Sequence, residues 1–146
     1  MDQLVFKKIS PQDAEYADVF ELREAILRKP IGLSLHDEDL SNEVNDHILT
    51  ANKQQELAGC LILTPKGNGI VQLRQMAVAA SQQGNNIGRQ LVQYAEQFAR
   101  DNGYTRIILH ARITAQGFYD KLGYTARGEV FTEVGIPHIE MEKQIG

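Results

Sequence analysis

Short segments that are apolar or alternate between apolar and polar residues recur along the chain, separated by residues that favour turns. The turn at Pro65–Gly69 joins two of these segments into a predicted hairpin, and another turn is expected over Ala51–Gln55. The stretch from Ile31 to Asn45 is acidic and weakly patterned, so we expect it to form a loop, with a short helix as the alternative. The predicted strands are Leu4–Ile9, His47–Thr50, Glu56–Thr64, Ile70–Val78, Arg106–His110, Tyr124–Ala126 and His138–Lys143.

Three other segments place apolar residues three or four positions apart, which is the spacing of a helix. They run from Ser10 to Lys29-Pro30, from Ile87 to Asn102-Gly103, and from Thr114 to Gly123. Ser10 and Thr114 are the expected N-caps of the first and third helix. Strands lead early and helices interleave later, without a repeat or a linker. Residues 1–146 are therefore predicted to form a single α/β domain, with a mixed sheet and helices on both faces.

Length and charge narrow the classes of function. A chain of 146 residues suits one domain with a real core, and a net charge of -4 argues against electrostatic binding to nucleic acid or an anionic membrane. The longest apolar runs fall short of the roughly 20 residues that a membrane helix needs. Cys60 is the one cysteine, so no intrachain disulfide is expected. These features predict a soluble cytoplasmic protein.

The segment between the strand Ile70–Val78 and the second helix is the leading candidate for a binding site. Gly84 and Gly88 permit a close approach of the backbone, and Asn85 or Asn86 tolerates a left-handed conformation. Such a turn directs several N–H groups to one point, and the helix adds its positive dipole end, so the segment is predicted to bind phosphate groups. The alternative is an ordinary strand-to-helix turn. The common patterns GxxxxGK[ST] and GxGxxG are both absent.

Two motifs together resemble the GNAT acetyltransferase superfamily. Gln83–Gly88 resembles its pyrophosphate loop, Q/R-x-x-G-x-G/A, and Phe118–Tyr124 resembles its later signature, Phe/Leu-Tyr-x-x-x-Gly-Phe/Tyr. The closing segment Gly135–Met141 resembles the small bacterial ElaA-like and YjcF-like branch. The resemblance implies a mostly antiparallel central sheet with a splayed central strand pair. It also implies acetyl-CoA as co-substrate, with no metal.

The resemblance further assigns roles to individual residues. It implies that the splayed strand binds the pantetheine arm and that the loop binds the pyrophosphate, while Arg89 either reaches a phosphate or lies on a solvated helix face. Two positions depart from the family pattern, because Asn86 replaces the first glycine of the loop and Arg112 replaces a frequent asparagine. The implied cofactor-binding residues are Met76, Ala77, Val78, Gln83, Gly84, Asn85, Asn86, Ile87, Gly88, Arg89 and Phe118.

Moving an acetyl group from a thioester to an amine needs a neutral amine, a donor to the carbonyl oxygen and a proton for the leaving thiolate. Tyr119 occupies the position from which the family usually protonates the thiolate, and simple packing on the helix face is its alternative role. The strand before the loop lacks the acid that many relatives use, which leaves His138, His110 or water as the base. No cysteine nucleophile is needed, so Cys60 is expected to pack in the core.

The acceptor and the assembly state stay open. A small-molecule or peptide amine is expected. The acidic run His36–Asp39, with Glu43 and Asp46, either holds a cationic amine or forms a solvated loop. A homodimer is one alternative for the assembly. A non-catalytic acyl-CoA-binding or regulatory module of the same fold is the competing function. A doubly wound flavin- or nucleotide-binding domain is the third alternative, which the early hairpin opposes.

Overall fold

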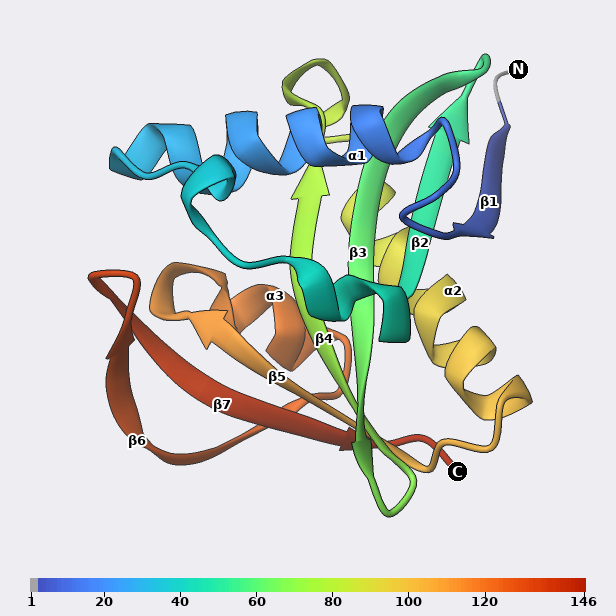
Figure 1. Cartoon of the computed structure of the whole chain (residues 1–146). Coiled ribbons are helices and arrows are strands. Elements are labelled where there is room, and N and C mark those ends of the chain that lie inside the picture. Colours follow the sequence, from blue (N-terminus) through green and yellow to red (C-terminus); the bar gives the residue numbers. More distant parts are fainter. Residues whose placement is uncertain (1–2) are drawn as a thin grey trace.

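One sheet of seven strands runs through the computed structural model, which describes residues 3–146 (Figure 1). The strand order is β1-β2-β3-β4-β5-β7-β6, and every neighbouring pair is antiparallel except β4 and β5, which are parallel. The strands are β1 (Leu4–Ile9), β2 (His47–Lys53), β3 (Glu56–Gly67), β4 (Ile70–Val78), β5 (Arg106–Arg112), β6 (Thr125–Glu133) and β7 (Ile136–Gln144). This topology confirms the predicted mixed, mostly antiparallel α/β sheet.

Helices cover both faces of the sheet, as predicted (Figure 1). The amphipathic helix α2 packs on one face through side chains such as Leu91 and Ala95, while Val19 of α1 packs with Ile48 and Ile62 on the other. The α-helices are α1 (Tyr16–Arg23), α2 (Ile87–Asp101) and α3 (Gln116–Lys121). A π-helical turn (Glu24–Arg28) continues α1, and the 3-10 turns are Lys29–Ile31, Leu35–Asp37, Ser41–Asn45, Ala80–Gln82 and Ile113–Ala115.

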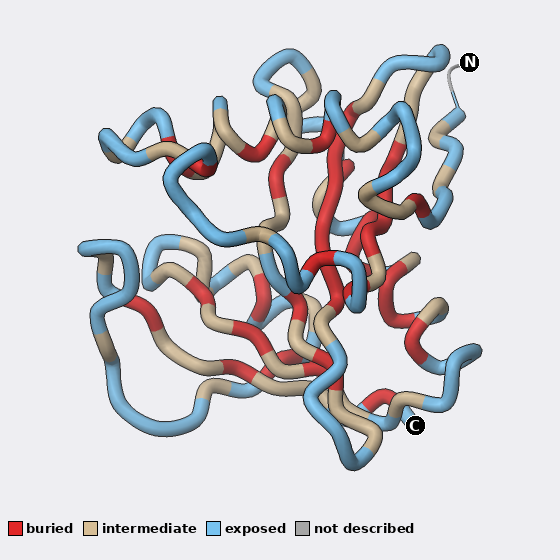
Figure 2. The backbone as a smooth tube through the Cα atoms, in the orientation of Figure 1, coloured by how far each residue is buried: buried red, intermediate tan, exposed pale blue. Residues whose placement is uncertain are grey.

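The centre of the sheet lies between these helices and is buried on both sides. Every residue of β3 from Ala58 to Leu63 is buried, since α1 covers one face of the strand and α2 the other (Figure 2). A strand that is buried on both faces carries a continuous apolar run instead of an alternating one. This explains the unbroken apolar segment around Cys60 in the sequence.

The parallel strands β4 and β5 pair along only part of their length. Their register runs from Ile70 opposite Arg106 to Leu73 opposite Leu109, which covers four positions of each strand. After Leu73, β4 contains a bulge at Gln75, which has a φ of 56° and shifts the register with β3. The carboxyl ends of the two strands therefore diverge, so the splayed pair that the resemblance implies is present (Figure 1).

The predicted N-caps of two helices are wrong. The Ser10 N–H donates to the Asp13 carboxylate at 2.8 Å and the Asp13 N–H donates to the Ser10 carbonyl at 3.0 Å, so these residues close a turn and α1 begins only at Tyr16. Thr114 lies inside a 3-10 turn, and α3 begins at Gln116 without a side-chain cap. In both places a local turn competes successfully with helix initiation.

Several strands are longer than their sequence patterns indicate. The first hairpin turn is confined to Gln54-Gln55, both with positive φ, and β3 continues to Gly67. β6 extends past Ala126 to Glu133, where it pairs with β7 as a largely exposed ribbon. Cross-strand hydrogen bonds stabilise these extensions without needing an apolar face, so hydrophobic spacing does not mark them.

Candidate active site

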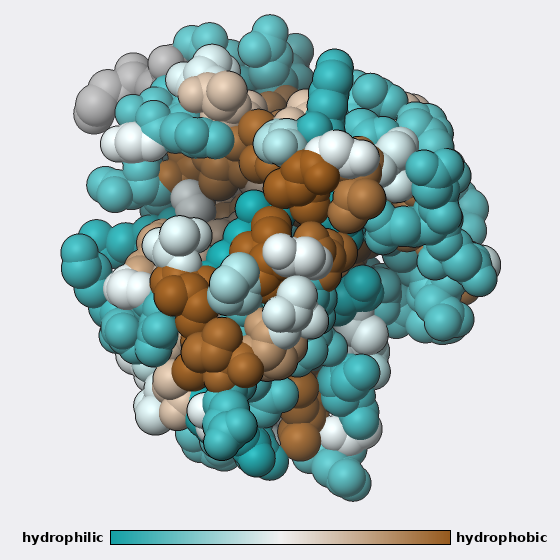
Figure 3. All heavy atoms as spheres, turned by 90° about the vertical axis from the view of Figure 1, so that its left-hand side faces the viewer, coloured by the Kyte–Doolittle hydropathy of each residue, from teal (hydrophilic) through white to brown (hydrophobic). Residues whose placement is uncertain are grey.

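A cavity of about 420 Å³ opens where β4 and β5 diverge. Its walls come from the ends of both strands, the turn that follows α1, the start of α3 and the β6–β7 hairpin. Figure 3 shows the side of the molecule on which the strands diverge, where apolar surface gathers between hydrophilic edges. Four of the predicted catalytic and cofactor-binding residues line this cavity: Met76, His110, Tyr119 and His138.

The loop between β4 and α2 has the backbone that its sequence predicts. Asn86 has a φ of 60°, so the left-handed conformation expected there is confirmed, and Gly84 also has a positive φ of 90°. The left-handed turn leads straight into α2, whose first helical bond runs from the Gln90 N–H to the Asn86 carbonyl at 3.1 Å. The N–H groups of the first turn precede that bond and are available to an anion.

Side chains hold this loop against the end of β4. The Gln83 side chain donates to the Val78 carbonyl at 3.2 Å, and the Asn85 side chain donates to Gln82 at 3.3 Å. Ile87 is buried in the core, whereas Arg89 is exposed and points to no carboxylate within 4.0 Å among residues 3–146. The loop is therefore fixed on the side that faces β4 and the core, and its solvent-facing side remains accessible.

Gly88 leaves room beside Met76 and Phe118. A Cβ atom at Gly88 would lie 3.5 Å from the Phe118 ring and 3.8 Å from the Met76 methyl, which is ordinary contact, but a larger side chain would fill the space at the start of α2. Three of the predicted cofactor residues thus meet at one point. This arrangement fits a pyrophosphate approaching the helix N-terminus closely. The binding role of each residue stays a prediction.

Tyr119 is buried on α3, with 7% of its surface exposed, and lines the cavity. Its ring packs edge-on against Phe118 and Tyr124, at centroid distances of 4.9 and 5.8 Å. Burial raises the pKa of Tyr119 to about 12. Within residues 3–146 no hydrogen-bond partner is assigned to its hydroxyl. The group therefore remains a proton donor at neutral pH, with its donor capacity unused by the protein.

His110 and His138 face one another across a carboxylate that the sequence analysis missed. Glu133 places one oxygen 2.9 Å from His110 Nδ1 and the other 3.7 Å from His138 Nε2. The His138 ring is buried, and its Nδ1 lies 2.7 Å from the Ile136 carbonyl, which can only accept, so Nδ1 is the donor and Nε2 carries the lone pair of the neutral ring. We name this group, His110, Glu133 and His138, the histidine bridge.

The missed residue had a weak signal in the sequence. Glu133 lies opposite Ile136 in the β6–β7 ladder and Phe131 lies opposite His138, so both depend on a strand that was predicted to end at Ala126. The available sign of a strand was the group of β-branched and aromatic residues Val130, Phe131, Thr132 and Val134. Without the strand, nothing placed Glu133 near either histidine.

The acidic residues before β2 do not line the cavity, and several of them pair with other groups. Glu38 pairs with Arg28 at 2.7 Å, and the Asp39 carboxylate accepts from the Ser41 N–H at 3.0 Å. Glu43 is buried against Arg23. The prediction that this acidic run binds a cationic acceptor therefore has no geometric support. The cavity is lined instead by three arginines and by Glu133 as its one carboxylate among the described residues.

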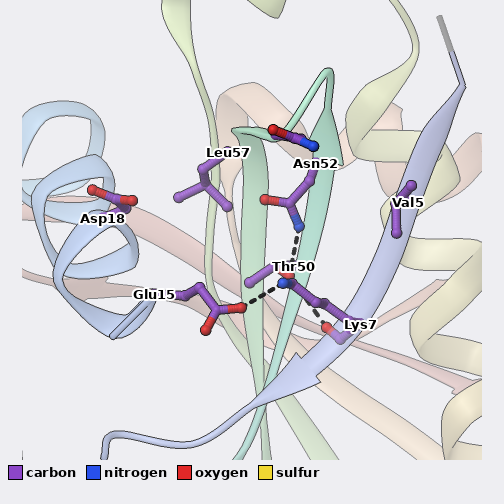
Figure 4. A pocket seen from close by; sticks show the side chains of 8 residues that line it. Val5, Lys7, Glu15, Asp18, Thr50, Asn52 and Leu57 are labelled. Carbon is purple, nitrogen blue, oxygen red and sulfur yellow. Dashed lines mark hydrogen bonds and ion pairs between the residues drawn. The ribbon is translucent and has the colours of Figure 1, made fainter. Parts of the chain in front are cut away.

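A second cavity, of about 240 Å³, lies between the start of α1 and strands β1–β3 (Figure 4). Lys7 pairs with Glu15 across it, the Thr50 hydroxyl donates to the Lys7 carbonyl at 3.3 Å, and Asn52 donates to Thr50 at 3.1 Å. These polar groups satisfy each other, and none of the predicted site residues lines this cavity. The divergence of β4 and β5 is therefore the better candidate site.

Three further observations concern Cys60, metal ligands and membrane-spanning helices. Cys60 is buried, and burial raises the pKa of its thiol to about 12, which suits the predicted core position. Over residues 3–146, no three His, Cys, Asp or Glu side chains are arranged to hold a metal ion. No helix in the same range is long and apolar enough to cross a membrane.

Curated relatives cover nearly the whole chain. BSU40680 of Bacillus subtilis, which is described as an acetyltransferase, is 31% identical over 143 residues, covering 94% of this chain and 95% of that protein. The N-acetyltransferase YjcF of the same organism is 28% identical over 138 residues, covering 92% and 96%. The predicted likeness to the YjcF-like branch is confirmed.

Solved structures share the fold over the same extent. An N-acetyltransferase structure from Lactobacillus plantarum has a TM-score of 0.86 at 26% identity, covering 99% of this chain and 98% of that one. Escherichia coli ElaA has a TM-score of 0.82 at 20% identity, covering 99% and 100%. A Bacillus subtilis acetyltransferase in complex with CoA has a TM-score of 0.76 at 19% identity, covering 97% and 99%.

A family model agrees with these likenesses. The model described as an acetyltransferase (GNAT) domain matches residues 16–145, which span α1 to the end of β7. The divergent strands, the loop before α2 and the tyrosine on α3 all fall inside that range. The chain belongs to the GNAT acetyltransferase family.

Proposed function

We propose that the chain transfers the acetyl group of acetyl-CoA to an amine of a small molecule or peptide, which attacks the thioester directly. The observation that carries the proposal is the cavity between β4 and β5, where Tyr119 and His138 line one space. One residue offers a proton and the other a lone pair, which are the two functions that aminolysis of a thioester requires. Family membership supports the reaction class.

The β4–α2 loop and the open edge of β4 would hold the co-substrate. The start of α2 offers N–H groups to the pyrophosphate, and Gly88 leaves space for it beside Phe118. Beyond Leu73 the edge of β4 that faces β5 is not paired with that strand, so the backbone of Met76 and Val78 would bind the pantetheine arm. CoA in the Bacillus subtilis neighbour is consistent with this use of the fold.

Acetyl-CoA supplies a thioester carbonyl, at which a carbon–nitrogen bond forms as the carbon–sulfur bond breaks. His138 Nε2 takes the proton that the attacking amine loses, and the Tyr119 hydroxyl gives a proton to the departing sulfur. Glu133 Oε2, 3.7 Å from Nε2, then pairs with the imidazolium. The Ile136 carbonyl fixes the ring so that Nε2 is the accepting atom.

A non-catalytic acyl-CoA-binding module is the second candidate. It is favoured by the side chains of β4 beside the cavity, Gln72, Arg74 and Gln75, which include no acid. The two candidates differ in a measurable product. A binding module would release heat with acetyl-CoA but would produce no free thiol with any amine.

Tyr119→Phe tests the proposed role of the hydroxyl as proton donor. The ring packing is kept, so acetyl-CoA should still stabilise the variant. The gain in the free energy of unfolding should be about 2.7 kcal/mol when the ligand is at one hundred times Kd. Turnover should fall by about 10²- to 10⁴-fold in kcat and kcat/KM together, and a donor with a more acidic thiol should restore part of it.

Tyr94→Phe is the matched control. Tyr94 lies on α2 outside the cavity, and its ring stacks on that of Phe6 with 4.9 Å between the centroids. Loss of its hydroxyl should therefore leave turnover unchanged. Wild-type turnover by Tyr119→Phe, with chemistry rate-limiting, would remove Tyr119 from the mechanism. Absence of any thermal shift with acetyl-CoA in the folded wild type would overturn the proposed function itself.

A further inference from the structure

We infer that the amine acceptor carries an oxyanion, a carboxylate or a phosphate, and that Arg112 binds this group with Arg28 beside it. The inference rests on the proposed function and names the class of its acceptor. It comes from the charges on the cavity wall, which are the reverse of those expected for a cationic acceptor.

Two guanidinium groups meet at one carbonyl oxygen. Arg28 Nη1 donates to the Leu27 carbonyl at 3.2 Å, and Arg112 Nη2 donates to the same oxygen at 3.4 Å. Arg28 also has Glu38 at 2.7 Å as a counter-ion. Arg112 has no carboxylate within 4.0 Å anywhere in residues 3–146, although it is half-buried. A partly desolvated cation beside a second cation favours an anionic ligand.

The rest of the wall adds positive charge. Arg74 lines the same cavity, and its nearest carboxylate, Asp46, lies 4.0 Å away, beyond hydrogen-bond distance. Glu133 is the one carboxylate on the wall formed by the described residues, and it is bonded to His110. A cationic acceptor would meet more arginine than carboxylate in this space, whereas an anionic one would balance it.

The position of Arg112 suits an acceptor that bears both an amine and an oxyanion. Arg112 and His138 stand directly opposite each other in the antiparallel β5–β7 ladder. Side chains opposite one another in such a ladder lie on one face, with Cβ atoms about 4.5–5.5 Å apart. An oxyanion bound by the planar fork of Arg112 would therefore leave a nearby amine beside His138. Amino acids and short amino phosphates have this form.

Matched acceptors provide the test. Glycine and β-alanine are compared with glycinamide and β-alaninamide for the carboxylate, and O-phosphoethanolamine with ethanolamine for the phosphate. We expect kcat/KM to be about 10- to 100-fold higher for the anionic member of at least one pair, the range of a charge-assisted hydrogen bond. The amides carry the less basic amines and so more neutral amine at a given pH, which biases the comparison against this result.

Variants assign the preference to Arg112. Arg112→Gln should reduce kcat/KM for the anionic acceptor to that of its neutral partner, mainly through KM. Arg112→Glu should invert the preference toward diaminoethane, a gain that misfolding cannot produce. Arg106→Gln is the matched control, because Arg106 lies on the same strand, pairs with Glu142 at 3.7 Å and lies outside the cavity.

The outcomes separate this inference from the proposed function. Equal kcat/KM for anionic and neutral acceptors would overturn the anionic acceptor while leaving acetyl transfer intact. A rise in KM for acetyl-CoA alone in Arg112→Gln would assign the arginine to the co-substrate and also overturn it. No thiol release with any amine would contradict the proposed function instead.

Discussion

Two polar clusters lie beside the divergence of β4 and β5, and they are built in opposite ways. One, which we name the closed network, consists of Tyr16, Arg23, Glu43 and Gln75. Arg23 donates twice to the Glu43 carboxylate, at 3.0 and 2.8 Å, and Tyr16 donates to the same carboxylate at 2.5 Å. Arg23 Nε donates to the Gln75 side-chain oxygen at 3.2 Å, so the network ends on the bulge of β4.

In the histidine bridge, by contrast, some hydrogen-bonding atoms have no close partner among residues 3–146. Glu133 is exposed and holds His110 at 2.9 Å but stands 3.7 Å from His138, which keeps an accepting nitrogen at the cavity. In the closed network the side chains of Arg23 and Glu43 are only 1% and 6% exposed and pair with each other. The two clusters therefore differ in how many of their polar groups are already paired within the protein. The closed network is bonded to the bulge that separates the strands, and the bridge leaves a histidine nitrogen open to the cavity.

The closed network gives the largest expected effect. Arg23→Ala would leave the buried Glu43 carboxylate without its cation, so the free energy of unfolding should fall by about 3–5 kcal/mol. Urea denaturation measures this. The double variant Arg23→Met, Glu43→Leu removes both charges and should recover most of the loss. If the double variant were as unstable as Arg23→Ala, the charge pair would not be the cause.

His138→Ala removes one member of the histidine bridge. Removal of the proposed general base should lower kcat by about 10²-fold, whereas the free energy of unfolding should fall by no more than about 2 kcal/mol. Stopped assays of thiol release and thermal melts measure the two quantities. The thermal shift with acetyl-CoA should be unchanged. An unaltered pH–rate profile would move the role to His110 or to water.

Glu133→Gln sharpens the comparison within the bridge. The amide keeps a hydrogen bond to His110 but loses the charge that pairs with the imidazolium of His138, so kcat should fall by about 10-fold with KM unchanged. Because Glu133 acts through His138, the double variant with His138→Ala should be no slower than His138→Ala alone. Additive losses would contradict a positioning role.

Tyr16→Phe gives the smallest effect and depends on pH. Burial, assisted by the bond to Glu43, raises the pKa of Tyr16 to about 12, against an ordinary value near 10. The folded protein thus holds this proton after the unfolded chain has lost it, so stability falls as pH rises from about 10 to about 12. Tyr16→Phe should flatten that part of the urea-stability profile and cost about 1 kcal/mol at neutral pH. An identical alkaline slope would contradict the assignment.

The sequence predicts best where backbone conformation and apolar spacing agree. The α2 helix, from Ile87 to the turn at Asn102, follows from its apolar spacing, and the left-handed Asn86 follows from the conformations that asparagine tolerates. The topology followed from the family resemblance and not from local patterns. Tyr119 was singled out in the same way, and its burial beside the cavity agrees with the role proposed for it.

The rest depends on contacts between distant residues. Arg23 and Glu43 are 20 positions apart, and their pairing buries one acid of a loop in which Asp37–Asp39 stay exposed. Glu133 lies on an exposed strand that carries little hydrophobic pattern, and it meets His110 across 23 positions. Charged side chains have no periodic signal that indicates their partners, so neither cluster could be read from the chain alone.

Val134 follows Glu133 at the tip of the β6–β7 hairpin and has a φ of 46°, in a region that β-branched residues rarely adopt. Asn or Gly would occupy this position with less strain, by about 1 kcal/mol or more. Selection for thermostability alone would therefore favour replacing this valine. The same turn follows Glu133 directly and forms part of the cavity wall, so relief of the strain would also change the wall that a substrate is proposed to contact. Conformational stability and the shape of the cavity are therefore coupled at the hairpin tip.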